Sequence, residues 1–369
     1  MDSKTDILIL TARFGTGHMS ASLGIREHIK GLYPTLKIKI VDVFNIIIPK
    51  LSSIMYKGYE VLVKKSPKLY NYFYKRDNEK QGSSSIIVDN KYILNKLYGY
   101  ILRINPKLII STFPIASQYI SKLKKDYNLT TPLITCITDI VNGWEWISYG
   151  CDMYFVATEE NKKNMINMAV DARKIVVTGI PIRKEFLKDE KPITKLSFPK
   201  ENTILTVMGG GMGLLLEDKE FYQWINSISN VTVLVLTGNN NVLFETISNW
   251  NLKNIIPIKF TDKVASIMAQ TDLLISKAGG ITLFEAITKG LPMIIYKPEL
   301  GQELENARFV KEKGIGEIAS DIDNLKQIIE SFRRDENKIN KYRLNIKELK
   351  NIINMKVLVE ESIRLISNY

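Results

Sequence analysis

The chain of 369 residues lacks long apolar runs, has few cysteines and has no positively charged N-terminal segment. No apolar run approaches the roughly 20 residues that a membrane-spanning helix requires, so we expect any membrane contact to be at the surface. The two cysteines, Cys136 and Cys151, are too few for a disulfide framework and lack metal-ligand spacing, which favours a reducing cytoplasm. Asp2 and Asp6 stand where a signal peptide carries positive charge, so we expect no secretory leader.

Acidic residues are outnumbered by basic ones. Lys and Arg total 51 against 39 Asp and Glu, which gives a formal net charge of +12. Hydrophobic residues make up 45% and charged residues 24%, an ordinary globular composition that argues against extensive disorder. The excess of cations fits an anionic partner, namely nucleic acid, anionic lipid or a nucleotide diphosphate, or else a solvated basic surface.

Short apolar runs rich in Ile, Leu and Val alternate with helical patterns along the chain. Such runs are typical of strands buried on both faces of a parallel sheet, with helices as the crossover connections. The sequence therefore predicts an α/β fold. The predicted strands are Asp6–Thr11, Lys37–Phe44, Leu108–Thr112, Pro132–Asp139, Met153–Thr158, Lys174–Gly179, Thr203–Met208, Val231–Thr237, Ile255–Phe260, Asp272–Lys277 and Pro292–Tyr296.

The length favours two domains, because a single hydrophobic core rarely grows beyond about 250–300 residues. Residues 181–202 are rich in Lys, Glu and Pro, with little periodicity, and we interpret them as the connection between domains. We predict an N-terminal domain of residues 1–179 and a C-terminal domain of residues 180–340, both doubly wound, with a cleft between them. A terminal helical segment, residues 341–369, is predicted to pack back on the first domain.

Three glycine-rich turns directly follow predicted strands: Ala12–His18, Gly209–Gly213 and Ser276–Gly280. Glycine lets the backbone approach a ligand closely, and free amides at a helix N-terminus attract phosphate oxygens. None of the three is a Walker loop or a G-x-G-x-x-G dinucleotide motif, and many α/β turns need glycine for the turn alone. Three such turns together favour a phosphate-bearing ligand.

One of the only two histidines lies at the first of these turns. His18 stands where the loop meets the helix, and an imidazole is suited to deprotonating a hydroxyl near neutral pH. A histidine that merely stabilises the loop is the alternative. Asp139 ends a predicted strand, where it could orient His18, act as the base itself or cap the next segment. We place the second histidine, His28, on the surface of the helix.

The second half carries a long signature. The run Asp272–Ala286, followed by Lys289–Pro292, Gly301–Glu303 and Asn306, resembles the donor site of a GT-B glycosyltransferase family. That family contains the monogalactosyldiacylglycerol synthases and the processive diacylglycerol glucosyltransferases, and it is related to the muramyl-lipid N-acetylglucosaminyltransferase of peptidoglycan synthesis. Gly179–Arg183 resembles another turn of the family, and the resemblance covers nearly the whole chain. It implies two Rossmann-like, doubly wound domains facing a central cleft.

The resemblance also implies roles for individual residues. Glu285 would accept hydrogen bonds from ribose hydroxyls, Arg183 would neutralise the pyrophosphate, and uracil would bind near Phe260. Without the resemblance, these residues are interpreted as a charge that complements a helix dipole, a solvated arginine and a core aromatic. The implied donor-binding residues are Gly17, Arg183, Gly209, Gly210, Gly211, Gly213, Phe260, Ser276, Gly279, Gly280, Thr282, Glu285, Gln302, Glu303 and Asn306.

The chain departs from the resembled family at two places in the first domain. Relatives often carry a histidine where this chain has Phe113. They often carry another a few residues after the pair Thr138-Asp139, where this chain reads Ile140–Trp144 and has Gly143. Both departures bear on acceptor choice and activity, and not on donor binding.

Residues 49–80 combine an apolar helical face with aromatic and basic residues. Leu51 and Ile54 fall on one face of a predicted helix, while Lys57 and Glu60 fall on another. Rings mixed with cations suit a lipid headgroup boundary, and the resembled family places its acceptor-binding segment here. The alternative is an ordinary helical excursion packed on the sheet. The predicted membrane and acceptor contacts are Tyr59, Lys64, Lys65, Lys68, Tyr72, Lys75 and Arg76.

The sequence and the resemblance together predict an inverting glycosyltransferase that moves a hexose from a UDP-sugar to a membrane lipid, diacylglycerol above all. No cofactor, no protein-bound metal and no nucleic acid partner are expected, and the enzyme is placed in the cytoplasm, peripheral on the inner face of the cell membrane. Two alternatives stay open: the same fold and donor with a polyprenyl-linked or other acceptor, and a non-enzymatic basic protein that binds nucleotides or polyanions.

Overall fold

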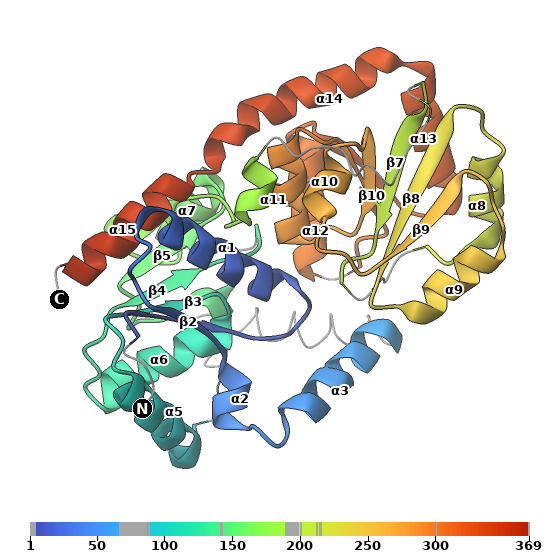
Figure 1. The fold of residues 1–369 in the computed structure, drawn as a ribbon. Coiled ribbons are helices and arrows are strands. Elements are labelled where there is room, and N and C mark those ends of the chain that lie inside the picture. Colours follow the sequence, from blue (N-terminus) through green and yellow to red (C-terminus); the bar gives the residue numbers. More distant parts are fainter. Residues whose placement is uncertain are drawn as a thin grey trace. The chain divides into compact units, whose positions relative to one another are not determined.

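The structure, a computed structural model, describes residues 5–65, 87, 89–140, 143–188, 199, 201–211, 213, 216–299 and 301–367 (Figure 1). For residues 59–65 and position 336 it describes the backbone alone. The chain forms two compact units. Unit 1 is Met1–Lys184 with Ile352–Tyr369, and unit 2 is Glu185–Asn351.

Unit 1 contains a parallel sheet of six strands in the order β2-β1-β3-β4-β5-β6. Its strands are β1 (Ile7–Thr11), β2 (Ile38–Asp42), β3 (Leu108–Ser111), β4 (Leu133–Cys136), β5 (Met153–Val156) and β6 (Ile175–Val177). Its helices are α1 (Gly17–Leu32), α2 (Val43–Ile47), α3 (Ser52–Lys65), α5 (Lys91–Ile104), α6 (Pro114–Asp126), α7 (Glu159–Asn167) and α15 (Met355–Ser367), with the 3-10 helices η1 (Trp144–Trp146) and η2 (Ala172–Lys174).

Helices cover both faces of the first sheet. Successive residues of a strand point to opposite faces, so one strand can contact helices on both sides. In β1, Ile7 and Ile9 pack against α1 and α15, whereas Leu8 and Leu10 pack against α2, α5 and α6. Every residue of β1 is buried. The central strand is therefore apolar throughout, as expected for a parallel sheet covered on both sides.

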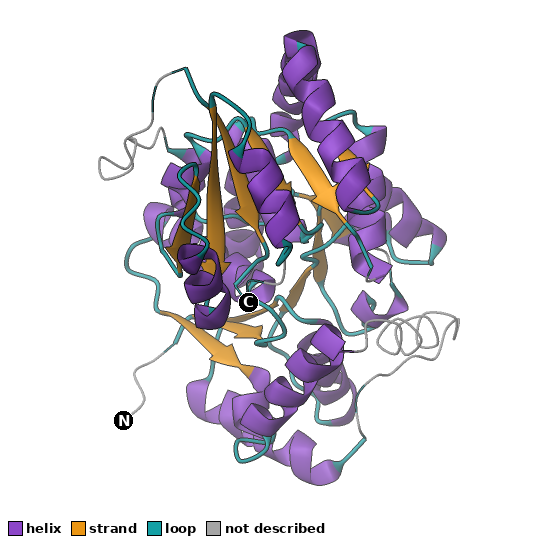
Figure 2. Ribbon diagram, turned by 90° about the vertical axis from the view of Figure 1, so that its right-hand side faces the viewer, coloured by secondary structure: helices purple, strands orange, loops and turns teal. Residues whose placement is uncertain are grey.

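Unit 2 contains a second parallel sheet of six strands in the order β12-β11-β10-β7-β8-β9. Figure 2 shows the strands in orange, with helices in purple beside them. Its strands are β7 (Thr203–Met208), β8 (Val231–Gly238), β9 (Ile255–Lys259), β10 (Leu273–Ser276), β11 (Met293–Tyr296) and β12 (Gly316–Ala319). Its helices are α8 (Lys219–Asn226), α9 (Asn241–Asn249), α10 (Val264–Met268), α11 (Gly280–Lys289), α12 (Gly301–Glu312), α13 (Ile322–Arg334) and α14 (Glu336–Leu349). The 3-10 helices η3 (Lys184–Leu187) and η4 (Lys350–Ile352) lie where the chain passes between the units.

The second sheet is layered in the same way. On one face, Val233, Val235 and Ile275 pack with side chains of α8, α9 and α13. Helices α10, α11 and α12 lie together on the other face (Figure 1). Both units are thus three-layered α/β sandwiches, which confirms the predicted fold class.

All the predicted strands are present, with ends that differ by a few residues, and the structure adds β12. The sequence analysis missed β12 because Gly316–Ala319 is a short edge strand with a glycine and a glutamate, and so lacks an apolar run.

The compact units differ from the predicted domain bounds at both junctions. Unit 1 extends to Lys184, and the terminal segment is divided, since α14 belongs to unit 2 and α15 to unit 1. The reason is packing: Leu358 and Val359 of α15 are buried in the core of unit 1, and the Asn354 amide donates to the Thr178 carbonyl.

Across the described residues, the helices are all too short or too polar to cross a bilayer.

Candidate functional site

Each sheet has one point where the chain reverses the direction in which strands are added. In unit 1 this point lies between β1 and β3, which are neighbours, and in unit 2 it lies between β7 and β10. The segments that follow the two strands leave toward opposite faces, so a crevice opens at their carboxyl ends, and ligands of open α/β sheets bind there. The loop before His18 follows β1, and the turns with Gly209 and Gly279 follow β7 and β10.

His18 lies at the start of α1, beside the end of β3. Its carbonyl accepts hydrogen bonds from the hydroxyls of Ser22 at 2.9 Å and Thr112 at 3.2 Å. Its ring Nδ1 lies 3.0 Å from the hydroxyl oxygen of Thr138, which follows β4. Residues from three parts of unit 1 therefore fix both the main chain and the ring of His18.

Aromatic rings surround the imidazole. The centroid of the Phe113 ring lies 5.1 Å away in an edge-on arrangement, and that of Trp146 lies 6.3 Å away. Burial lowers the pKa of His18 to about 4, against a smaller rise from a hydrogen bond with the Thr112 backbone. The ring is therefore neutral at pH 7, which is the form that can accept a proton.

Phe113, which stands where relatives often have histidine, belongs to an aromatic cluster. It stacks on Phe14 at 5.3 Å between centroids, and Phe14 also meets the edges of Phe44 and Tyr56 at 5.6 and 5.0 Å. Such pairs add favourable contacts beyond the burial of apolar area. The sequence analysis missed this cluster, because its members are scattered between positions 14 and 113.

Helix α3 is tied to the loop that precedes His18. The Tyr56 hydroxyl donates to the Asp42 carboxylate, 2.8 Å from each of its oxygens, and accepts the Arg13 amide at 3.1 Å. Burial, together with the adjacent carboxylate, raises the pKa of Tyr56, so its hydroxyl stays protonated. The loop between β1 and His18 is thus held on one side by α3.

Thr138, Asp139, Gly17 and Gly143, which the sequence singled out, all lie in unit 1. Thr138 contacts the ring directly, and Asp139, the next residue, is half-buried at the carboxyl end of β4. Gly17 is the first residue of α1, and Thr16 before it makes no side-chain capping bond. A Cβ at Gly143 would overlap the Glu145 carboxylate, so a larger residue at this position requires the end of the Glu145 side chain to move. The catalytic role of Asp139 stays a prediction.

The prediction for His28 is wrong. His28 is buried, and its Nε2 lies 3.0 Å from the Ile182 carbonyl, which can only accept. Beside it, Glu27 accepts Nε of Arg183 at 3.1 Å and the amide of Lys184 at 2.8 Å. These bonds fasten α1 to the segment that follows β6, which is why this face of the helix is enclosed. The predicted pyrophosphate ligand Arg183 thus has a carboxylate partner within unit 1.

In unit 2, the glycine loop after β7 packs closely on the turn after β8. Gly210 and Gly213 have φ of +69° and +61°, values that favour glycine. A Cβ at Gly213 would lie within 2.1 Å of the Thr237 carbonyl oxygen, and the Asn239 amide donates to the Gly211 carbonyl at 3.1 Å. The predicted residues Gly209, Gly210, Gly211 and Gly213 therefore share one tight turn.

Helix α11 opens at the carboxyl end of β10. Gly279, its N-cap residue, is exposed and has no side chain of its own that could cap the helix, and the free amides of a helix N-terminus attract anions. The Ser276 hydroxyl donates to the Met208 carbonyl at 2.9 Å, which joins the ends of β10 and β7. Glu285, one turn into the helix beyond Gly280 and Thr282, is buried.

Helix α12 contributes the remaining predicted donor residues. Gln302 Oε1 is buried and has no hydrogen-bond partner among the described residues. Glu303 accepts the Glu299 amide at 3.2 Å. Asn306 is fully enclosed, and its amide donates to the Ala278 carbonyl at 2.7 Å, so it supports the turn before α11. At the end of β9, Phe260 is 64% exposed, which rules out the core-aromatic interpretation.

One Asp-x-Asp triplet exists, Asp321–Asp323, a pattern that can hold a divalent ion. Asp321 caps α13 by accepting the Asn324 amide at 2.8 Å, and Asp323 is 90% exposed near Lys326. Across the described part of the chain, His, Cys, Asp and Glu form no group of three that could hold a metal ion.

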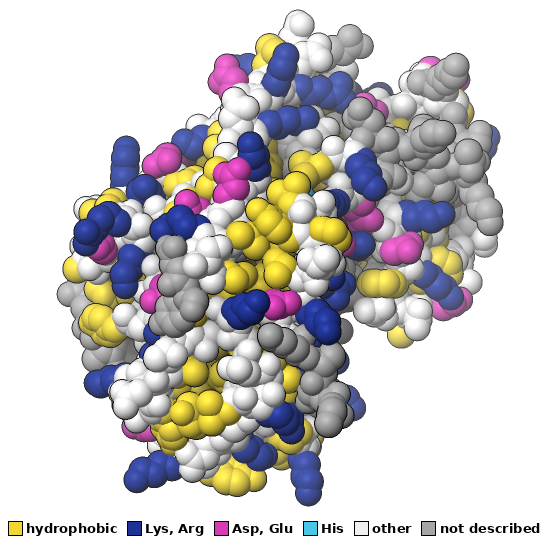
Figure 3. Space-filling view, turned by 60° about the vertical axis from the view of Figure 1, so that its left-hand side comes forward, with side chains coloured by type: hydrophobic (Ala, Val, Ile, Leu, Met, Phe, Trp, Pro, Cys, Tyr) yellow, Lys and Arg dark blue, Asp and Glu magenta, His cyan; other side chains and the backbone are white. Residues whose placement is uncertain are grey.

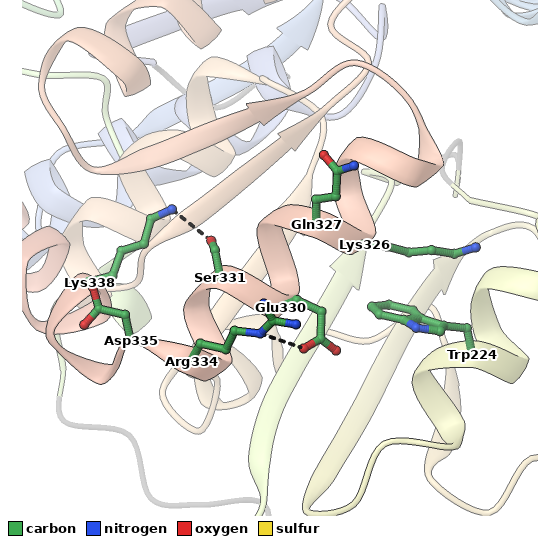
Figure 4. Close-up of a pocket in the computed structure, with 8 residues that line it drawn as sticks. All are labelled: Trp224, Lys326, Gln327, Glu330, Ser331, Arg334, Asp335 and Lys338. Atoms are coloured by element: carbon green, nitrogen blue, oxygen red, sulfur yellow. Dashed lines mark hydrogen bonds and ion pairs between the residues drawn. The ribbon is translucent and has the colours of Figure 1, made fainter.

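A groove of about 670 Å³ lies elsewhere in unit 2, between α8, α13 and α14 (Figure 4). It is lined by Trp224 and by cations that already have partners, since Lys338 lies 2.9 Å from Glu317 and Arg334 lies 4.0 Å from Glu330. The residues that line the groove include none of those predicted to bind the donor.

The predicted membrane segment is described only in part. Leu51 and Ile54, at the start of α3, are 58% and 66% exposed, while Met55 packs against the core. For Tyr59, Lys64 and Lys65 the helical backbone is described without side chains, and Lys68, Tyr72, Lys75 and Arg76 lie outside the described residues. On the face shown in Figure 3, Lys and Arg are spread over the surface with Asp and Glu among them, and form no continuous basic stripe.

Comparison with known proteins decides the family. The family model of monogalactosyldiacylglycerol (MGDG) synthase matches residues 18–182, and the glycosyltransferase family 28 C-terminal domain matches residues 204–359. The chain is 32% identical over 340 residues to a processive diacylglycerol beta-glucosyltransferase of Staphylococcus aureus, covering 88% of this chain and 84% of that protein. A protein of the same description from Bacillus subtilis is 26% identical over 386 residues, covering 99% and 96%.

The chain belongs to the glycosyltransferase family that contains the MGDG synthases and the processive diacylglycerol beta-glucosyltransferases. Solved structures agree on the fold: the glycosyltransferase of kitacinnamycin has a TM-score of 0.65 at 12% identity, covering 98% of this chain and 99% of that one. Acinetobacter baumannii MurG has a TM-score of 0.63 at 12% identity, covering 97% and 99%. The predicted GT-B fold with two Rossmann-like domains is confirmed, and the chain is a glycosyltransferase.

Proposed function

We propose that this glycosyltransferase moves a hexose from a UDP-sugar to diacylglycerol and inverts the anomeric carbon. The observation that carries the proposal is the imidazole of His18, held beside the rings of Phe113 and Trp146 at the point in unit 1 where α/β sheets bind ligands. The named relatives, which are diacylglycerol beta-glucosyltransferases, support the acceptor and the sugar class.

The donor is proposed to bind unit 2. The uncapped start of α11 at Gly279 offers amides to the diphosphate, and the exposed ring of Phe260 offers a face to the uracil. Glu285 serves the ribose hydroxyls, and Gln302 Oε1, buried without a described partner, serves a sugar hydroxyl. Helix amides and protein cations would stabilise the negative charge of the diphosphate in place of a metal ion. The reaction is therefore expected to need no cofactor and to continue in the presence of EDTA.

The chemistry is a single displacement. The acceptor hydroxyl oxygen forms a bond to C1 of the sugar while its proton passes to the free nitrogen of His18. The bond from C1 to the diphosphate oxygen breaks, and its electron pair leaves with UDP. Because the hydroxyl attacks from the side opposite the diphosphate, an α-linked donor gives a β-glycoside.

The acceptor is proposed to be reached at the inner face of the cell membrane, where the enzyme binds as a peripheral protein. The exposed Leu51 and Ile54 of α3 supply apolar area, and the net charge of +12 attracts anionic lipid. Helix α3 is the element that Tyr56 joins to the loop before His18.

The decisive experiment incubates the enzyme with a panel of UDP-sugars and liposomes that contain diacylglycerol, and identifies the products by lipid mass spectrometry and NMR. A β-linked hexosyl-diacylglycerol is expected. A product only on a polyprenyl-linked acceptor would refute the proposed acceptor, an α-linkage would refute inversion, and RNA retention without any glycosylated product would favour a binding protein. His18→Gln should remove the activity while leaving UDP affinity, measured by calorimetry, unchanged.

A further inference from the structure

Thr138 contacts the candidate base directly through its side-chain hydroxyl. Its oxygen lies 3.0 Å from Nδ1 of His18, across 120 positions of sequence. Thr138 is only 3% exposed, two residues beyond the end of β4. A buried hydroxyl on the ring of a base is placed to control which nitrogen carries the proton.

The rest of the surroundings leave the ring little freedom. The hydroxyls of Ser22 and Thr112 lie 2.9 and 3.2 Å from the His18 carbonyl oxygen, and the hydroxyl oxygens of Thr112 and Thr11 are 3.0 Å apart. Thr11, Ser22 and Thr112 are completely buried. The main chain of His18 is thereby fixed, and Thr138 is the side chain whose hydroxyl lies at hydrogen-bond distance from the imidazole, beside the bond to the Thr112 backbone.

We propose that Thr138 is a positioning residue for glycosyl transfer. Its hydroxyl oxygen accepts a hydrogen bond from the Nδ1–H group of His18, so that the lone pair on Nε2 is the one that takes the proton of the lipid acceptor's hydroxyl. The inference rests on the proposed role of His18 as the base. It follows from geometry, because Nδ1 is the ring nitrogen that faces the buried Thr138 hydroxyl, and Nε2 is the nitrogen on the other side of the ring. Since a hydroxyl is uncharged, Thr138 orients the ring without raising its affinity for protons, which a carboxylate in the same place would do.

Three substitutions and one control test the proposal. Thr138→Val keeps the shape and removes the hydroxyl, Thr138→Ser restores it, and Thr138→Asp introduces a carboxylate. Thr135→Val is the matched control, since Thr135 is a buried threonine of the adjacent strand β4 whose hydroxyl bonds Ser117 at 2.9 Å and not His18.

Kinetics should separate positioning from folding. Thr138→Val should lower kcat roughly 100-fold, the loss typical of a misplaced catalytic group, with KM for the UDP-sugar unchanged. Thr138→Ser should recover most of that rate, and Thr135→Val should match the parent. Thr138→Asp should move the acidic limb of the pH–rate profile to higher pH. Parental kcat in Thr138→Val would overturn the proposal.

Nitrogen NMR of the side chains reads the tautomer without reference to activity. Only His18 and His28 contribute imidazole signals, and His28 is an internal reference with its proton on Nε2, because Nε2 faces a carbonyl. His18 should carry its proton on Nδ1 in the parent and in Thr138→Ser, and lose that preference in Thr138→Val. A proton on Nε2 in the parent would overturn the proposal. If His18→Gln keeps full activity, the base assignment fails instead, whatever the tautomer shows.

Discussion

Gly213 offers a quantitative test of the loop that follows β7. Replacing it with alanine introduces two costs. A left-handed residue with a Cβ costs about 1–2 kcal/mol, and φ here is +61°. The new Cβ would also lie 2.1 Å from the Thr237 carbonyl oxygen, and relieving such an overlap by moving main chain typically costs about 1–3 kcal/mol. The expected loss is therefore about 2–5 kcal/mol, the sum of these ranges.

Gly210 is the matched control for this substitution. Its φ is +69°, yet a Cβ there meets nothing within 4 Å, so Gly210→Ala bears only the conformational cost of about 1–2 kcal/mol. Calorimetric unfolding should show Gly213→Ala melting clearly below Gly210→Ala, and Gly210→Ala below the parent. UDP affinity should fall more in Gly213→Ala, because its loop must shift. Equal melting temperatures for the two variants would refute the close approach of the loop to Thr237.

The remaining predictions concern the donor, the titration of unit 1 and the membrane. Glu285→Gln should weaken UDP binding by about 1–3 kcal/mol in calorimetry, the range for a lost charged hydrogen-bond partner, whereas Glu220→Gln, exposed on α8, should not; unchanged affinity would remove Glu285 from the site. Burial lowers the pKa of His18 to about 4 and also lowers that of His28, so unit 1 should hold its full stability above pH 6.5 and lose it as pH falls toward 4. In urea titrations, the free energy of unfolding of His18→Gln should differ less between pH 7 and pH 5 than that of the parent. An equal difference in both proteins would show that the His18 ring is not desolvated. Replacing Leu51 and Ile54 with Gln should reduce flotation with anionic liposomes, whereas Val242→Gln, 77% exposed on α9, should not; equal flotation of all variants would refute docking through α3.

The aromatic cluster around Phe113 shows what surrounds position 113, where relatives often carry a histidine. Phe113 is 8% exposed and stacks on Phe14, while its edge-on contact with His18 adds to the burial that keeps the imidazole neutral. A second histidine at this position would place another titratable group beside the base. This chain instead surrounds His18 with apolar rings and hydroxyls.

The sequence alone was sufficient for the layered fold and for the positions of the loops. Strands such as Leu273–Ser276 are nearly continuous in apolar residues, and glycines follow them where the chain must turn, so both signals are local. The donor signature from Asp272 to Asn306 is also local, because it is one continuous stretch of sequence that covers α11, the first half of α12 and the segments before them. The short edge strand Gly316–Ala319 was missed, since four residues with a glutamate carry too little pattern.

Only the tertiary structure decided which side chains meet. Thr138 reaches His18 across 120 positions, Tyr56 reaches Arg13 across 43, and His28 reaches the Ile182 carbonyl across 154. No periodicity encodes such pairs, because they arise from the order of strands in the sheet. That order, β2-β1-β3-β4, brings the ends of β1, β3 and β4 together and places a threonine hydroxyl on the imidazole. The sequence determined that a histidine stands at the loop, and the fold determined what holds it there.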